Sequence, residues 1–384
     1  MLRWTLFSLA CALLAFGSLT TVRSPDWSPW RLAVLAGEYG HWLAVAAIGV
    51  VFGAWLTRGA GALSILTMTV AAGAVVLLLK PAFQASRIAA PMAEQLAAQF
   101  GPAVIPRPPF SFTDLFLGRR SAPVAVQTLD VPAGLPLDFY RASRSDGRAA
   151  PCVIVVHGGG WDSGDREQIP HFNHWLARQG YAVAAVSYRL APKFQWPAQR
   201  DDVLSAIAFL KSHAAELNVD ASKLILLGRS AGGQIAQCVG YTANDPAIRG
   251  VVGLYAPSDL IFGYVNTHEN DMLKSPALMR QFLGGTPDSA RANYESASPL
   301  FHVTPRSPPT LLLHGTIDAV AWYRHSVRLD AKLAEMKVPR AFVLMPWATH
   351  AFEFNLQGPG GQLTTYALEW FLAGVTDSVP GVGT

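Results

Sequence analysis

Apolar residues form three long, uninterrupted stretches near the start of the chain and short, bounded runs in the remainder. The long stretches cover residues 4–22, 39–57 and 59–79, and none of them contains Asp, Glu, Lys or Arg. A helix of about 20 apolar residues crosses the hydrocarbon core of a bilayer. The pattern therefore predicts a membrane region in residues 1–80, with about three transmembrane helices and the lipid bilayer as its partner.

The first stretch has two other interpretations. Arg3 precedes it and would suit a cleaved signal peptide, and Cys11 ends a short motif that resembles a lipoprotein site. The apolar part of a signal peptide is about 7–15 residues long, which is shorter than this stretch, and the run before Cys11 is too short for a lipoprotein signal. We therefore expect an uncleaved span, with cleavage as the alternative.

Basic residues beside the predicted spans indicate the orientation, because cytoplasmic loops carry an excess of Lys and Arg. One side has Arg23, Arg31, Lys80 and Arg87, and the other has Arg3 and Arg58. This small difference favours an integral protein of the cell membrane whose C-terminal region lies on the cytoplasmic surface. An uncleaved first span with Arg3 inside would place that region across the membrane.

Residues 81–123 have a different composition. Residues 82–100 show the pattern of an amphipathic helix. The prolines that follow restrict the backbone to extended conformations; they are Pro102, Pro106, Pro108 and Pro109. This segment predicts a stiff linker, too short to carry the next domain far from the bilayer surface.

From residue 124 to residue 384, short apolar runs alternate with helical patterns. The runs are bounded and several are β-branched, as in buried parallel strands; they cover residues 153–156, 182–186, 224–227, 251–254, 311–313 and 341–344. This alternation predicts a single α/β domain with a mostly parallel sheet and helices on both faces.

Composition supports this division of the chain. Hydrophobic residues make up 51% and charged residues 15%, which is too apolar for a disordered protein. The formal net charge is +4, but the basic residues form no long run, which argues against nucleic-acid binding. Cys11, Cys152 and Cys238 lack the spacing of a zinc site or a disulfide framework, so we expect no metal ion.

The clearest chemical motif is Gly-Arg-Ser-Ala-Gly-Gly at residues 228–233, which follows a predicted strand and opens a predicted helix. This is the context of a nucleophile elbow, in which a tight turn between small residues lifts the serine hydroxyl above the sheet. Ser230 is therefore the candidate nucleophile.

Consecutive glycines after an earlier predicted strand suggest an anion-binding loop. The sequence His-Gly-Gly-Gly-Trp at residues 157–161 can turn its backbone N–H groups toward one point without interference from side chains. Gly159 and Gly160, together with Ala231 after the serine, are the candidate donors to a tetrahedral oxyanion.

An alcohol nucleophile needs a base, and the base needs an orienting carboxylate. His350 follows the last predicted strand, and Asp318 follows the strand before it, so both reach the sheet edge where ligands bind in open α/β folds. Asp259 follows another strand and is the alternative acid. His157 and His314 are expected to have structural roles.

Over roughly residues 124–373 the chain resembles the hormone-sensitive-lipase-like and BD-FAE-type carboxylesterases of the α/β-hydrolase superfamily. The matching motifs are HGGGW at 157–161, YRLAP at 188–192, WPAQRDDV at 196–203, GRSAGG at 228–233, SPL at 298–300, HGTID at 314–318 and THAF at 349–352. The resemblance implies an α/β-hydrolase fold and a serine esterase without a cofactor. It implies a catalytic triad and oxyanion donors made by Ser230, Asp318 and His350 and by Gly159, Gly160 and Ala231.

Two features depart from the family pattern. Arg229 stands where hormone-sensitive-lipase-like members usually have an acidic residue, and membrane spans are not part of the common pattern. Asp202 matches a family position that is structural, so we expect it to pack near the YRLAP turn and take no part in catalysis.

These observations predict a serine carboxylesterase that hydrolyses short-chain acyl or acetyl esters of small molecules through an acyl-enzyme. Residues 260–297 are expected to form part of a lid, with Phe262, Tyr264, Met272 and Leu273 as walls of an acyl pocket. A membrane lipase, a peptidase or an isoprenylcysteine-methylesterase-like hydrolase of the same fold is the alternative. A non-catalytic binding module on a hydrolase scaffold is the alternative from another class.

Overall fold

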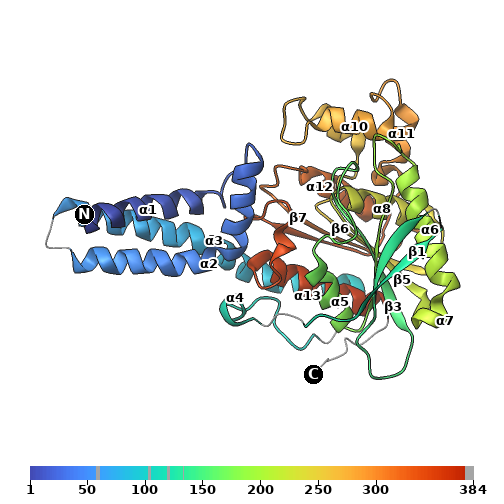
Figure 1. Ribbon diagram of the computed structural model, residues 1–384, viewed down its shortest axis with the longest axis horizontal. Helices are drawn as coiled ribbons and strands as arrows, with labels where there is room; N and C mark the ends of the chain where they lie inside the picture. Colours follow the sequence, from blue (N-terminus) through green and yellow to red (C-terminus); the bar gives the residue numbers. More distant parts are fainter. Residues whose placement is uncertain (58–60, 103–104, 119–121, 133, 377–384) are drawn as a thin grey trace.

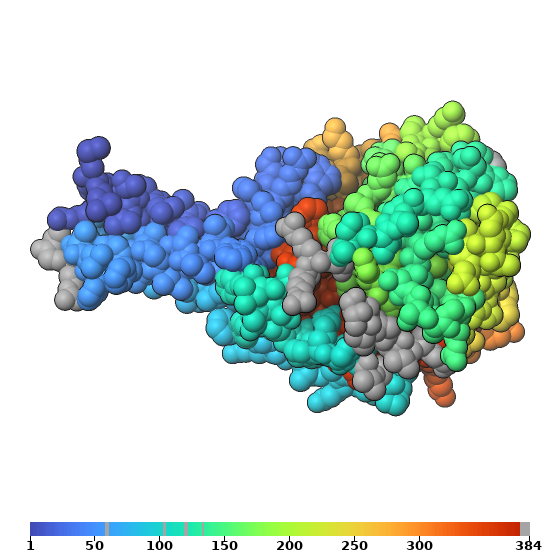
Figure 2. Space-filling view, turned by 60° about the horizontal axis from the view of Figure 1, so that its bottom comes forward, coloured from blue at the N-terminus to red at the C-terminus, as the bar shows by residue number. Residues whose placement is uncertain are grey.

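The computed structural model shows a rounded α/β body from which an arm of three N-terminal helices projects (Figures 1 and 2). It describes residues 1–57, 61–102, 105–118, 122–132 and 134–376. The arm is blue and the body runs from green to red in both figures, so the change of shape follows the change in composition along the sequence.

Within the described residues, eight strands form one sheet in the order β1-β2-β4-β3-β5-β6-β7-β8. They are β1 (Val126–Val131), β2 (Leu135–Tyr140), β3 (Ala150–Val156), β4 (Ala182–Val186), β5 (Val219–Arg229), β6 (Ile248–Leu254), β7 (Thr310–Gly315) and β8 (Arg340–Met345). β2 runs antiparallel to β1 and β4, and the other neighbouring strands are parallel. The predicted mostly parallel sheet is confirmed.

Both faces of the sheet are buried. Successive side chains of a strand point to opposite faces, and in β3 Cys152 and Ile154 join one apolar cluster while Val153 and Val155 join the other. The first cluster lies against α6 (Ala198–Ser212), α8 (Ala231–Thr242) and α12 (Arg324–Glu335). The second lies against α3 (Ala62–Phe100), α5 (Pro170–Arg178) and α13 (Pro359–Thr376). Helices therefore cover both faces, as predicted.

Shorter elements connect these layers. They are α4 (Asp114–Leu117), α7 (Ala214–Leu217), α9 (Leu260–Val265), α10 (Ser275–Leu283), α11 (Arg291–Ser296), η2 (Pro299–His302) and η3 (Phe352–Phe354). The segment from α9 to α11 corresponds to the predicted lid.

The arm contains two helices long and apolar enough to cross a membrane, within the described residues, where the sequence predicted about three spans. These are α2 (Trp27–Leu56, 30 residues) and α3 (39 residues). The helix α1 (Leu2–Ser18) has 17 residues and is shorter than predicted. It ends early because Thr20 and Thr21 use their hydroxyls to donate to Gly17 and Ser18 carbonyl oxygens, which satisfies the last turn.

Helix α3 differs from the predicted combination of a span and a separate linker helix. It continues without a break from the arm into the body, although Pro81 and Pro91 lie inside it. Its second half buries Met92 and Leu96 in the core cluster against the sheet. The first part of the predicted stiff linker is therefore packed into the fold.

This packing predicts that the body needs the second half of α3. A form lacking residues 1–100 would lose Met92 and Leu96, whose burial contributes about 3–6 kcal/mol. We expect it to be insoluble, or to melt well below the full-length protein in thermal unfolding followed by circular dichroism. A form lacking only residues 1–18 is the control, because α1 packs mainly on α2 and α3. Equal melting temperatures for the full-length protein and the form lacking residues 1–100 would contradict this prediction.

Candidate active site

Ser230 lies at the sharp turn between β5 and α8, the strand–turn–helix arrangement expected for an elbow. Its backbone has φ 53° and ψ −124°, a conformation that non-glycine residues rarely adopt, and its N–H donates to Leu254 O at 2.9 Å. The turn also requires a close approach: a Cβ on Gly232 would lie 2.1 Å from His157 O. Small residues at this point of the sequence therefore hold the serine in a strained, defined position.

The glycine loop lies directly beside this turn. A Cβ on Gly158 would lie 3.2 Å from Ser230 Cβ, so the two segments are in contact. Gly159 has φ 123°, and a Cβ there would lie 2.1 Å from Ser163 O, so no other residue fits this turn. Gly160 and Ala231 line the same cavity as Ser230.

His350 and Asp318 are in contact. His350 Nδ1 lies 2.7 Å from Asp318 Oδ2, and both side chains are buried. The other oxygen, Oδ1, accepts hydrogen bonds from the N–H groups of Val320 (2.8 Å) and Ala321 (3.0 Å). Burial alone would raise the pKa of Asp318, but the two histidines beside it, His350 and His314, hold that pKa well below its usual range. The carboxylate is therefore ionised at neutral pH.

Ser230 and His350 reach the same edge of the sheet. The Ser230 N–H donates a hydrogen bond to the Leu254 carbonyl oxygen. Tyr255, which follows Leu254, has its ring centre 4.1 Å from that of His350. Within the described part of the chain no hydrogen bond joins Ser230 Oγ to His350. Such contacts are often long in enzymes without substrate and shorten in the complex.

The alternative acid, Asp259, has other partners. Its Oδ1 accepts from Phe262 N at 2.9 Å and so caps α9, and its Oδ2 lies 2.6 Å from Arg328 Nη2. The geometry therefore pairs His350 with Asp318 and gives Asp259 the role of anchoring the lid segment.

The other two histidines contact nearby groups. His157 Nδ1 lies 2.8 Å from Gly158 O, and its ring stacks on Tyr188, which fits the predicted role in shaping the loop. His314 Nδ1 lies 2.8 Å from Ser326 Oγ, and its Nε2 lies 3.3 Å from Asp318 Oδ2. The contact with the carboxylate was not part of the prediction.

A cavity of about 70 Å³ lies beside Ser230. Phe262 and Leu273, two of the four residues predicted as acyl-pocket walls, line this cavity. Tyr264 and Met272 are not among its lining residues; the hydroxyl of Tyr264 instead accepts a hydrogen bond from Arg280.

Sequence reasoning missed several walls of this cavity, among them Leu278, Trp322 and His325. Burial, together with electrostatic interactions with His314 and Arg328, lowers the pKa of His325 to about 3, so the His325 imidazole is neutral at neutral pH. These residues carry no motif, because tertiary packing alone brings them to the site.

Arg229, the departure from the family pattern, is buried beneath the elbow. Its Nε lies 2.8 Å from Glu353 Oε1, and the Tyr255 hydroxyl donates to the same oxygen. Its guanidinium carbon lies 4.5 Å from the centre of the Phe172 ring. The acidic partner is thus supplied by η3, which the sequence pattern could not reveal.

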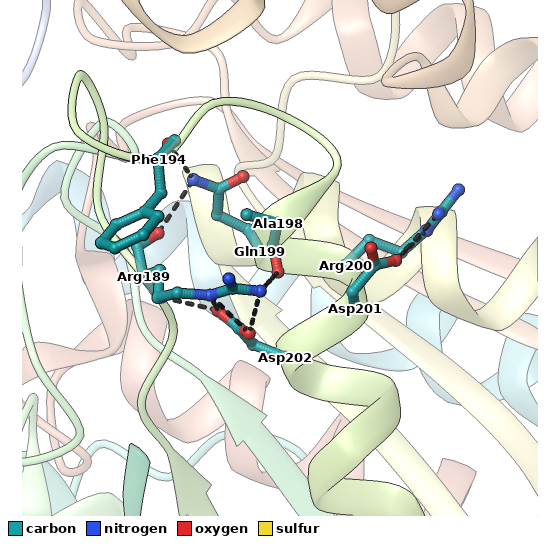
Figure 3. A network of polar contacts seen from close by, with 7 residues as sticks. All are labelled: Arg189, Phe194, Ala198, Gln199, Arg200, Asp201 and Asp202. Carbon is teal, nitrogen blue, oxygen red and sulfur yellow. Dashed lines mark hydrogen bonds and ion pairs between the residues drawn. The ribbon is translucent and has the colours of Figure 1, made fainter. Parts of the chain in front are cut away.

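Asp202 has a structural contact, as expected. Arg189 donates to it through the backbone N–H and through Nε, both at 2.8 Å (Figure 3). In the same network Gln199 Nε2 donates to the carbonyl oxygens of Arg189 and Phe194. The YRLAP turn is also joined to the glycine loop, because the Ala191 N–H donates to the Trp161 carbonyl oxygen at 2.9 Å.

No group of three or more His, Cys, Asp or Glu side chains that could hold a metal ion occurs in the described part of the chain.

Curated relatives share the body of the protein. The chain is 30% identical to esterase LipC of Mycobacterium tuberculosis over 254 residues, which cover 63% of this chain and 62% of LipC. It is 28% identical to esterase LipQ of the same organism over 244 residues, with coverage of 60% and 58%. The chain thus matches about three fifths of the length of these relatives.

A solved structure and a family model agree with the fold. A bacterial heroin esterase has a TM-score of 0.58 at 21% identity, covering 75% of this chain and 99% of that one, which shows the same fold. The family model named BD-FAE matches residues 137–333, about half of the chain and most of the body. Because the family model matches about half of the chain and the chain has an α/β-hydrolase fold, the chain belongs to the BD-FAE family.

Proposed function

We propose that the protein is a serine carboxylesterase that hydrolyses esters of short acyl groups. The observation that carries this proposal is the His350–Asp318 contact at the edge of the sheet where Ser230 stands on its strained turn. The names of the curated relatives, which are esterases, support the same class of reaction.

In this proposal His350 takes the proton of Ser230 as the hydroxyl oxygen attacks the ester carbonyl. The same histidine returns the proton to the leaving alcohol, which leaves an acyl-serine. A water molecule then gives a proton to His350 and attacks the acyl carbonyl. As the bond to the serine oxygen breaks, His350 returns this proton to Ser230 Oγ and the carboxylic acid is released. Asp318 keeps the imidazole in the required tautomer and stabilises its charged form.

The tetrahedral intermediates would be stabilised by backbone N–H groups. Gly159, Gly160 and Ala231 are the proposed donors, because the glycine loop touches the elbow and two of these residues line the cavity beside it. Each such donor contributes about 3–4 kcal/mol in enzymes where it has been measured.

The size of the cavity supports a short acyl group. An enclosed volume of about 150 Å³ holds benzene, so a cavity of about 70 Å³ accepts only a few non-hydrogen atoms. We expect the full-length protein to hydrolyse p-nitrophenyl acetate or butyrate with a kcat/KM at least tenfold above that for the palmitate. Equal or higher kcat/KM for palmitate would contradict the short-chain assignment.

A cavity variant sharpens this measurement. Leu278 lines the cavity and lies against Gly160, where a Cβ would be 2.9 Å from Leu278 Cδ2. Leu278→Ala should enlarge the acyl site and raise the ratio of hexanoate to acetate hydrolysis. An unchanged ratio would mean that the acyl group binds elsewhere.

The N-terminal arm supports a place at the membrane. We infer that α2 and α3 anchor the protein in the bilayer, with the body on its surface. Arg23, which follows α1, lies 5.6 Å from the ring centre of Trp322 in the cavity wall, so the end of the arm is close to the proposed site.

Activity measurements distinguish this proposal from the alternative functions. A lipase would prefer the long-chain esters, a peptidase would cleave amides, and an isoprenylcysteine-methylesterase-like enzyme would favour methyl esters. A non-catalytic binding module would not react with a fluorophosphonate probe, whereas the proposed nucleophile would.

A further inference from the structure

Glu38 is a buried acidic residue on α2, a helix of mainly apolar residues, and only 1% of its surface is exposed. Its Oε2 accepts hydrogen bonds from the backbone N–H groups of Gly360 (2.9 Å) and Gly361 (3.4 Å), in the first turn of α13. The backbone carbonyl of Glu38 accepts another from Asn355 Nδ2 at 2.9 Å. The arm and the body are therefore joined through both the side chain and the backbone of one residue.

The turn before α13 and the first turn of α13 leave space for the Glu38 side chain. A Cβ on Gly358 would lie 2.3 Å from Glu38 Oε2, and a Cβ on Gly360 would lie 2.7 Å from its Oε1. Glycine at both positions therefore allows the close approach. The free N–H groups at the helix N-terminus supply hydrogen bonds to this side chain, which would be costly to bury without partners.

The segment that receives Glu38 also carries His350. It runs from the end of β8 to the start of α13, and Trp347 precedes the histidine in it. Trp347 is fully buried against α2, since its Cδ1 lies 3.6 Å from where a Cβ of Gly37 would be. The arm thus contacts this segment both before and after the histidine.

The same segment has a second attachment, on the strand that carries the nucleophile. Glu353 pairs with Arg229, the residue before Ser230, and accepts from Tyr255, whose ring packs on His350. The position of the imidazole relative to the serine therefore depends on how this segment is held between its two attachments.

We propose that Glu38 is a positioning residue for His350, so that the N-terminal arm is part of the support of the active site. This inference rests on the proposed function. Loss of the bonds that Glu38 makes would let the histidine segment shift, and a misplacement of about 1 Å can lower the rate about 100-fold without removing any reacting group.

The test uses the full-length protein in detergent micelles, with active sites counted by a fluorophosphonate probe. For Glu38→Ala we expect kcat per counted site on p-nitrophenyl acetate to fall at least about tenfold, with KM changed less than about twofold. Glu38→Gln keeps an oxygen acceptor at the same place and should retain at least about half of the native kcat. Glu94→Gln makes the same substitution at an exposed position of α3 and should match the native protein.

A purely structural role would lower the melting temperature and the fraction of active sites while leaving kcat per counted site unchanged, and this result would overturn the proposal. Equal losses for Glu38→Gln and Glu38→Ala would also overturn it. If Glu38→Ala does not fold, Asn355→Ala removes one bond to the arm, and its kcat per site should fall; an unchanged value would be decisive against the idea. A native protein without esterase activity would instead refute the proposed function.

Discussion

Ser230→Ala is expected to reduce kcat for p-nitrophenyl acetate by about 10⁶-fold, to the level that binding and the oxyanion donors alone sustain. The serine supplies the atom that becomes acylated, so its loss removes the acyl-enzyme route entirely. Alanine retains Cβ, so the substitution leaves the same strained backbone conformation at this position. The measurement compares initial rates of the purified full-length proteins, after circular dichroism has shown that both fold.

Probe labelling provides the control. Ser275 also lines the cavity, so it is the matched serine for this experiment. A fluorophosphonate should label the native protein and Ser275→Ala but leave Ser230→Ala unlabelled. Labelling that persists in Ser230→Ala and disappears in Ser275→Ala would transfer the nucleophile to α10.

Asp318→Asn is expected to lower kcat by about 10⁴-fold, if the trypsin-type precedent applies. The carboxylate accepts from His350 Nδ1 and carries the negative charge that stabilises the imidazolium. An amide of the same shape removes this charge and can present an N–H to the imidazole, which favours the wrong tautomer. The kcat of the two proteins at neutral pH, measured on the same short-chain ester, gives the effect directly.

Asp259→Asn is the matched comparison, because it makes the same chemical change at the other strand-end carboxylate. Asparagine can still cap α9, and the lost ion pair with Arg328 lies partly in solvent, so kcat should change only a few-fold. If Asp259→Asn were inactive while Asp318→Asn kept a near-native kcat, the acid would have to be reassigned to β6.

Much of the body follows from local patterns in the sequence. The apolar runs are strands because both faces of a parallel sheet are buried, and the predicted elbow stands between β5 and α8 because a small-residue turn must follow such a strand. The contact between Asp318 and His350 could be expected for the same reason, since each residue follows a strand that ends at one edge.

Features that depend on distant parts of the chain could not be predicted. The partner of Arg229, Glu353, could not be identified because it is far away in sequence and carries no motif. Nothing in the sequence around Glu38 indicates its contact with α13. The sequence predicted a span and a separate linker helix, yet α3 stays helical through Pro81 and Pro91, and its second half packs on the sheet.

Because α3 is continuous, its length determines the rotation of the arm relative to the body. Each residue inserted between Lys80 and Ala85 would turn the arm by about 100° about the helix axis and shift it by about 1.5 Å. Such a turn would carry Glu38 away from α13. Seven extra residues, close to two full turns, would restore the angle but displace the arm by about 10 Å. A flexible connection can gain or lose residues at little cost. The arm's contacts with the body fix both the angle and the length of this helix. We therefore expect insertions and deletions to be excluded from it.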